Sequence, residues 1–189
     1  MEDVYVFSED APYDLIDGIR ESGMMPRGLR YAASVTGPWR LFGIYEMEDL
    51  SQLPALTKGA IGSDTGICAT RGTRYLKKSV YHPDSAFVRI HVGSIDPEPD
   101  ADQAEKLLEE IRSIVRDERY AADEEGEAES VMGDFDVLAY VGGDDADRIA
   151  QRIRAIRALQ PVLKTVSLRV IDYVSTSERA ADDHRVRPA

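Results

Sequence analysis

The spacing of apolar and polar residues predicts one complete set of strands and helices in residues 1–76. Short apolar and β-branched runs between turn residues favour strands, and apolar residues three or four positions apart favour helices. The predicted elements are a strand at 4–8, a helix capped by Asp10 with Pro12 near its first turn, strands at 28–36 and 39–46, a helix at 48–56 and a strand at 64–76. Their order is β-α-β-β-α-β.

The same order is predicted again in residues 86–174. Residues 87–92 alternate strictly, so Phe87, Arg89 and His91 share one face of a predicted strand. The remaining elements are a helix ending near Arg119, strands at 127–132 and 135–141, a helix from Asp144 and a strand at 162–174. We place Phe135 with Val137 on the helix-side face, and Leu138 and Tyr140 on the opposite face.

A shared motif supports a duplication. The stretches SVTGPW (34–39) and SVMGDF (130–135) both read Ser-Val-x-Gly-x-aromatic and precede an apolar run and acidic residues. We therefore predict an α+β fold of two tandem ferredoxin-like units, 1–76 (a degenerate copy) and 86–174, with a linker at 77–85. The apolar side chains on the sheet face without helices favour closure into an α+β barrel, within one chain or between two. The polar segment 175–189 is predicted to be disordered.

Composition limits the function classes. The chain has 23 Lys and Arg against 35 Asp and Glu, and this net charge of −12 disfavours nonspecific binding of nucleic acid. Cys68 is the only cysteine and is interpreted as a small buried hydrophobic residue. The acidic N-terminus is not typical of a signal peptide, and no apolar run is long enough to span a membrane. We expect a cytoplasmic protein.

The second unit resembles a known family. The segments GDFDVLAYVGGDDADRIAQRI (133–153) and LQPVLKTVSLRVID (159–172) are similar to the effector-binding domain of the Lrp/AsnC regulators. The first copy matches less well and has Arg40 where the pattern has Asp. The resemblance implies a small-molecule sensor, often for amino acids, that forms dimers and higher oligomers. It also implies ligands at subunit interfaces, near the glycine-acidic hairpin turn. The family's helix-turn-helix is not predicted in residues 1–80.

Three candidate ligand-binding residues lie at this hairpin. Gly133 and Asp134 are expected to form the turn, where glycine permits positive φ. Exposed amides there can bind a carboxylate, as the resemblance implies. Asp136 is predicted on the open sheet face, where it can bind a ligand ammonium group or accept backbone N–H groups. The alternative for Asp136 is a purely structural role in the turn.

Other candidates come from the strands. Thr165, Ser167 and Arg169 share one face of the last strand and predict either a polar pocket or a wet interface. Arg89 suits a carboxylate, and His91 can be a base, a haem ligand, a metal ligand or a structural residue. Tyr140 completes the candidate set. The Cys and His spacing of a zinc site is absent from the sequence.

These observations leave three functional readings open. The first is a non-enzymatic, oligomeric effector-binding protein without its own DNA-binding domain or a cofactor, with an amino acid or related metabolite as ligand. The second is a barrel enzyme of the cofactor-poor monooxygenase or haem-handling type, in which Arg89, His91 and Tyr140 belong to the site. The third is a structural assembly partner without a small ligand.

Overall fold

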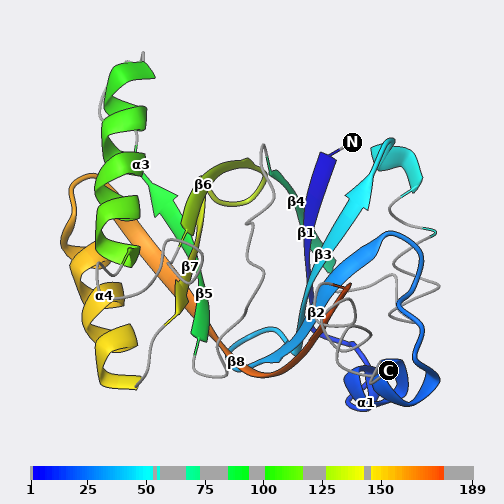
Figure 1. The fold of residues 1–189 in the computed structure, drawn as a ribbon. Coiled ribbons are helices and arrows are strands. Elements are labelled where there is room, and N and C mark those ends of the chain that lie inside the picture. Colours follow the sequence, from blue (N-terminus) through cyan, green and yellow to red (C-terminus); the bar gives the residue numbers. More distant parts are fainter. Residues whose placement is uncertain are drawn as a thin grey trace, which may run out of the picture. The chain divides into compact units, whose positions relative to one another are not determined.

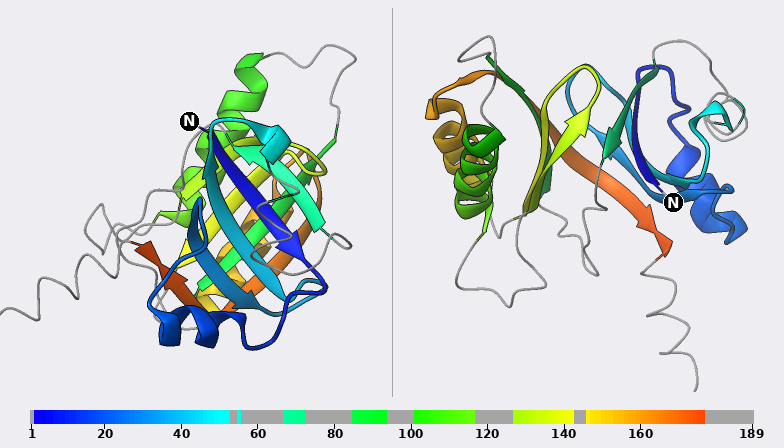
Figure 2. Two further views of the ribbon diagram at one scale, coloured as in Figure 1. Left: turned by 90° about the vertical axis from the view of Figure 1, so that its right-hand side faces the viewer. Right: turned by 90° about the horizontal axis from the view of Figure 1, so that it is seen from above.

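The computed structural model describes residues 2–52, 55, 67–72, 85–93, 101–116, 127–142 and 146–176. The chain divides into two compact units, which we call unit 1 and unit 2 (Figures 1 and 2). Unit 1 consists of Met1–Arg71 and Val170–Ala189, and unit 2 consists of Gly72–Arg169. Antiparallel sheets with helices on one face confirm the predicted α+β class. Among the described helices, none has the length and apolar character needed to cross a membrane.

Unit 1 is an antiparallel sheet with a short helix on one face. The strands follow the order β4-β1-β3-β2-β8. Ile16 and Ile19 of the helix are buried among sheet residues such as Val4, Val6 and Tyr45. The elements are β1 (Glu2–Ser8), α1 (Leu15–Ser22), β2 (Leu29–Val35), β3 (Leu41–Met47), the 3-10 turn η1 (Leu50–Gln52), β4 (Ile67–Gly72) and the C-terminal part of β8 (Val162–Ser175).

Aromatic side chains cover the other face of this sheet. The Phe42 ring lies 5.1 Å from Phe7, 6.0 Å from Tyr5 and 6.1 Å from Tyr31, measured between centroids. The same face carries Tyr173 of β8, whose ring stacks on Tyr31 at 5.7 Å. Because strand residues alternate between faces, these rings are separate from the residues that contact α1.

Unit 2 has a four-stranded sheet in the order β8-β5-β7-β6. Two helices cover one face of it (Figures 1 and 2). Aliphatic residues fill the layer between helices and sheet, and Val88, Ile111 and Ile156 have no exposed surface. The elements are β5 (Ser85–Val92), α3 (Ala101–Val115), β6 (Glu127–Met132), β7 (Val137–Gly142), α4 (Ala146–Ala158) and the N-terminal part of β8.

The two units have the same order of strands in the sheet when the four strands of each unit are numbered along the chain. The order β4-β1-β3-β2 in unit 1 corresponds to β8-β5-β7-β6 in unit 2. The strands of the predicted β-α-β-β-α-β pattern are thus present in both units, and the tandem duplication itself stays a prediction. The long strand β8 pairs with β5 up to Arg169 and with β2 from Val170 onward. The predicted bounds 1–76 and 86–174 stay a prediction, and in the structure the end of β8 groups with unit 1.

Several sequence predictions fall on residues outside the described part of the chain. In the predicted helix 48–56, residues 50–52 form a 3-10 turn, and only Ala55 among the residues that follow is described. Further undescribed stretches are 57–66, 73–84 at the end of the predicted strand 64–76 and in the linker, 94–100 before the helix of the second unit, 117–126 in the acidic loop, 143–145 at the predicted helix start and 177–189 in the tail.

Candidate functional site

The face of the unit 2 sheet that lies opposite the helices carries most of the candidate residues. Strand pairing sets Phe87 opposite Tyr140 and Arg89 opposite Leu138. These four residues are all buried, and the Phe87 and Tyr140 rings lie 5.2 Å apart. The predicted common face for Phe87, Arg89 and His91 is therefore confirmed. We call this surface the Arg89 face.

At one end of the Arg89 face, a cation, an imidazole and an aromatic ring come together. The Arg89 guanidinium lies over the Phe135 ring, 4.6 Å from its centroid. The His91 ring meets the same phenyl ring edge-on, with centroids 6.4 Å apart. Arg89 is only 7% exposed, whereas His91 is half-buried. The phenyl ring thus holds the guanidinium in place by a cation–π contact.

The position of Phe135 corrects the sequence prediction. We predicted Phe135 on the helix-side face together with Val137, but its ring contacts Arg89 and His91 on the opposite face. Residues 133–136 form a bend, and β7 begins only at Val137. The strand alternation therefore does not extend back to Phe135.

Glu129 is a member of the Arg89 face that sequence reasoning missed. It lies opposite Leu138, which in turn lies opposite Arg89, so the three residues form one row across β6, β7 and β5. Glu129 is only 3% exposed. The preceding run of acidic residues made it look like part of a solvated loop. The available signal was the predicted strand 127–132, in which Glu129 shares a face with the apolar Val131.

The hairpin carboxylate Asp136 binds backbone groups. Its Oδ2 accepts a hydrogen bond from the Val92 N–H at 2.7 Å, its N–H donates to the Ile90 carbonyl at 3.0 Å, and its carbonyl accepts from Val131 at 2.9 Å. These bonds join the bend to the end of β5, as the structural alternative for Asp136 requires. Gly133 and Asp134 are exposed in the same bend, and a ligand role for these three residues stays a prediction.

The three candidate residues of β8 do not join the Arg89 face. Thr165 pairs with Ile90, Ser167 with Val88 and Arg169 with Ala86. Since residues paired directly across strands share a face, the three polar side chains lie on the helix side. There the Arg157 Nε of α4 donates to Thr165 Oγ1 at 2.9 Å.

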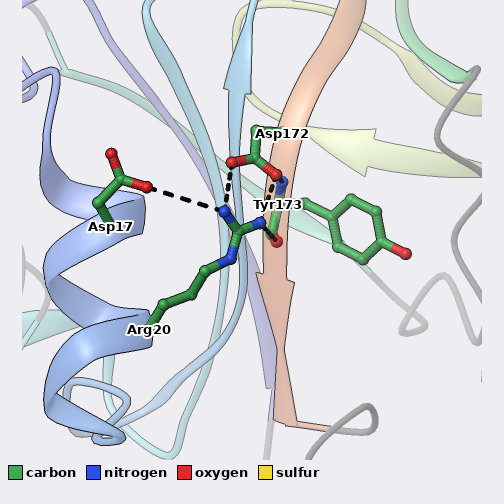
Figure 3. A network of polar contacts seen from close by, with 4 residues as sticks. All are labelled: Asp17, Arg20, Asp172 and Tyr173. Carbon is green, nitrogen blue, oxygen red and sulfur yellow. Dashed lines mark hydrogen bonds and ion pairs between the residues drawn. The ribbon is translucent and has the colours of Figure 1, made fainter.

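Unit 1 contains a separate polar network, which links α1 to β8 (Figure 3). Arg20 of α1 donates to both carboxylate oxygens of Asp172 and to the Tyr173 carbonyl at 2.9 Å. The side-chain hydrogen bonds from Arg20 are the main reason why the pKa of Asp172 lies below its ordinary value, and partial burial acts against them. Asp17 lies 3.8 Å from the same guanidinium. Sequence reasoning did not find this network, because its members are far apart in the chain.

The described residues around His91 do not fit a bound haem. A haem needs an axial ligand next to an open apolar slot, and His91 is the only histidine in the described segments. The Phe135 ring lies directly against both His91 and Arg89. The helix-covered layer of unit 2 is filled with aliphatic side chains.

Comparison with known proteins shows a shared fold. The chain matches no protein-family model and no curated protein. It is similar to a solved mutant chlorite dismutase from Candidatus Nitrospira defluvii, with a TM-score of 0.59 and 10% identity over 96% of this chain and 94% of the other. A chlorite dismutase candidate gives a TM-score of 0.58 and 10% identity over 91% and 96%. This similarity shows a shared fold of the dimeric α+β barrel type. The resemblance to the Lrp/AsnC effector domain is finer than this shared fold and stays a prediction.

Proposed function

We propose that this chain is a barrel enzyme of the cofactor-poor type that binds a small, flat organic anion at the Arg89 face. The observation that carries the proposal is the Arg89 guanidinium held over the Phe135 ring with the His91 ring beside it. A fixed guanidinium suits a carboxylate or phenolate group, and the neighbouring aromatic rings suit a flat ligand.

The same residues support proton transfer. Arg89 would hold the anionic group of the ligand, and the half-buried His91 imidazole would accept a proton from the bound molecule. Tyr140 and Phe87 would border the ligand on the same face.

Two observations favour an enzyme over the Lrp/AsnC-type sensor. The hairpin carboxylate Asp136, which the sensor reading would use for a ligand, already accepts a backbone hydrogen bond. The two solved structures described above carry the name of an enzyme, chlorite dismutase. Because the residues around His91 do not fit haem, we favour the cofactor-poor type within the enzyme class.

Titration calorimetry with salicylate, an aromatic carboxylate, tests the proposal. Arg89→Lys keeps the charge but loses the fork of N–H donors, so it should weaken salicylate binding about tenfold, or about 1.4 kcal/mol. His91→Gln should leave binding within about threefold, because the imidazole is assigned to proton transfer. The matched control is Arg154→Gln, which removes an exposed arginine from α4.

Leucine and haemin serve as competing probes. Leucine binding with no salicylate binding would support the sensor reading instead. Haemin binding that His91→Gln abolishes would restore the haem-handling reading. Equal weakening by Arg154→Gln and Arg89→Lys would show general charge attraction and would contradict the proposed site.

A further inference from the structure

A second polar surface of unit 2 lies along β8, on the helix-side face of the sheet. It consists of Arg157, Thr165, Ser167 and Arg169, and we call it the β8 strip. Thr165, Ser167 and Arg169 lie on this face because they pair with Ile90, Val88 and Ala86. The helices pack mainly on other strands, α4 on β5 and β7, and α3 on β6 and β7. The β8 strip therefore runs along the flank of α4.

Hydrogen bonding leaves donors available on the strip. Thr165 Oγ1 accepts the Arg157 Nε–H at 2.9 Å, so the hydroxyl keeps its own proton to donate. Arg157 is exposed, and within the described part of the chain this is its only hydrogen bond or ion pair. Its terminal N–H groups therefore extend beyond Thr165. Ser167 is half-buried and adds a second hydroxyl.

The strip is locally cationic in an acidic chain. The net charge of the protein is −12, yet α4 from Arg148 to its end contains four arginines and no carboxylate. On this face, the part of β8 that belongs to unit 2 contributes Arg169 and no acidic residue. An anion approaching this flank therefore meets an attractive local field.

We propose that the β8 strip binds a phosphate-type oxyanion carried by a small molecule. Thr165 and Ser167 alternate on one face, so their Cα atoms are about 7 Å apart. A tetrahedral oxyanion can accept from both hydroxyls across that gap at about 2.7 Å each. The Arg157 guanidinium supplies a charged fork on one side, and the exposed Arg169 supplies a second cation on the other. This site lies on the opposite sheet face from Arg89 and does not depend on the proposed function.

Calorimetric titration with inorganic pyrophosphate tests the strip at about 0.15 M salt, where diffuse attraction between exposed charges is screened. We expect Arg157→Gln to weaken binding at least tenfold. Ser167→Ala, which removes a hydroxyl without breaking a described hydrogen bond, should weaken it about threefold. Arg154→Gln is the charge-matched control on the same helix and should change the dissociation constant less than twofold.

The possible outcomes distinguish a specific binding site from general charge attraction and from a purely structural role of these residues. Absence of pyrophosphate binding to the unaltered protein would overturn the proposal. So would equal weakening by Arg154→Gln and Arg157→Gln. Thr165→Val should weaken pyrophosphate binding while circular dichroism still shows a folded protein. Unchanged binding would contradict a ligand role for Thr165 and would mean that the Arg157–Thr165 hydrogen bond only holds α4 against β8. Arg89→Lys should leave pyrophosphate binding unchanged, which keeps this test separate from that of the Arg89 face.

Discussion

At the residue scale, Tyr45 carries a hydroxyl group in an apolar core. Its side chain is fully buried in the core of unit 1, and its hydroxyl has no hydrogen-bond partner among the described residues. Burial raises the pKa of Tyr45 above its ordinary value near 10, because the phenolate would lose its hydration. The hydroxyl itself also loses hydration without a replacement bond, which costs about 1–3 kcal/mol.

Tyr45→Phe should therefore stabilise the protein, by about 1 kcal/mol in denaturant unfolding at pH 7. The raised pKa also predicts alkaline behaviour. Because Tyr45 ionises at a lower pH in the unfolded state than in the folded state, its titration leaves the free energy of unfolding unchanged below about pH 10 and lowers it above that pH. Tyr45→Phe should reduce that alkaline loss. Tyr13→Phe, at an 81% exposed tyrosine, is the control and should change neither quantity.

Single positions also show where sequence reasoning stops. Strict alternation correctly predicted that Arg89 and His91 share a face, because a strand allows only two directions for its side chains. The same rule failed for Phe135, where the bend interrupts the alternation before β7. Alternation also predicted a common face for Thr165 and Ser167, but it could not say whether this was the helix-side face or the Arg89 face. That choice depends on their pairing with β5, which is a long-range contact.

At the element scale, the Arg20 network fastens helix to sheet. The α1 helix has only eight residues, too few for stability in isolation. Its apolar residues Ile16 and Ile19 pack on the sheet, while Arg20 binds the Asp172 carboxylate on β8 (Figure 3). Both charged side chains are partly exposed, at 47% and 41%, so water screens the pair.

Arg20→Gln should destabilise the protein by only about 0.5–1 kcal/mol at pH 7 and low salt, because the pair is partly exposed. Hydrogen bonds from Arg20 lower the pKa of Asp172, so the pair stabilises the folded state above about pH 4. That contribution is lost as the pH falls through the lowered pKa. The stability difference between Arg20→Gln and the unaltered protein should thus shrink in acid. Asp17→Asn is the control, and an equal effect there would argue against the Arg20–Asp172 bond.

Whole elements were predicted better than their details. The order of strands and the two helices of unit 2 follow from periodicity, because each element buries one side. The Leu107, Ile111 and Val115 stripe of α3 lies in the core as its spacing requires. The network between α1 and β8 was not predictable, since Arg20 and Asp172 come together only after the sheet has formed. The same holds for Arg157 and Thr165.

At the scale of the whole molecule, β8 couples the two units covalently. One continuous strand, Val162–Ser175, pairs with β5 in unit 2 and with β2 in unit 1. Loss of order in this strand would remove an edge from both sheets. We therefore expect the two units to unfold together, as a two-state transition.

The single tryptophan, Trp39, makes this measurable. It belongs to unit 1, whereas the long helices α3 and α4 belong to unit 2. Thermal unfolding followed by Trp39 fluorescence and by helical circular dichroism should give the same midpoint. Ile156→Val, in the core of unit 2, should cost about 0.5–1.5 kcal/mol and lower both midpoints by about 2–4 °C. A fluorescence midpoint that does not move would show that the units unfold independently.

The course of β8 also has a consequence for folding during synthesis. Unit 2 is one continuous stretch, whereas unit 1 combines the first part of the chain with residues from Val170 onward. On the ribosome, the strands β1 to β4 therefore emerge first but wait for the last strand. Domains generally fold as units during translation, from the N-terminal side. In this chain the order is reversed. All strands of unit 2 are synthesised before the last strand segment of the unit 1 sheet.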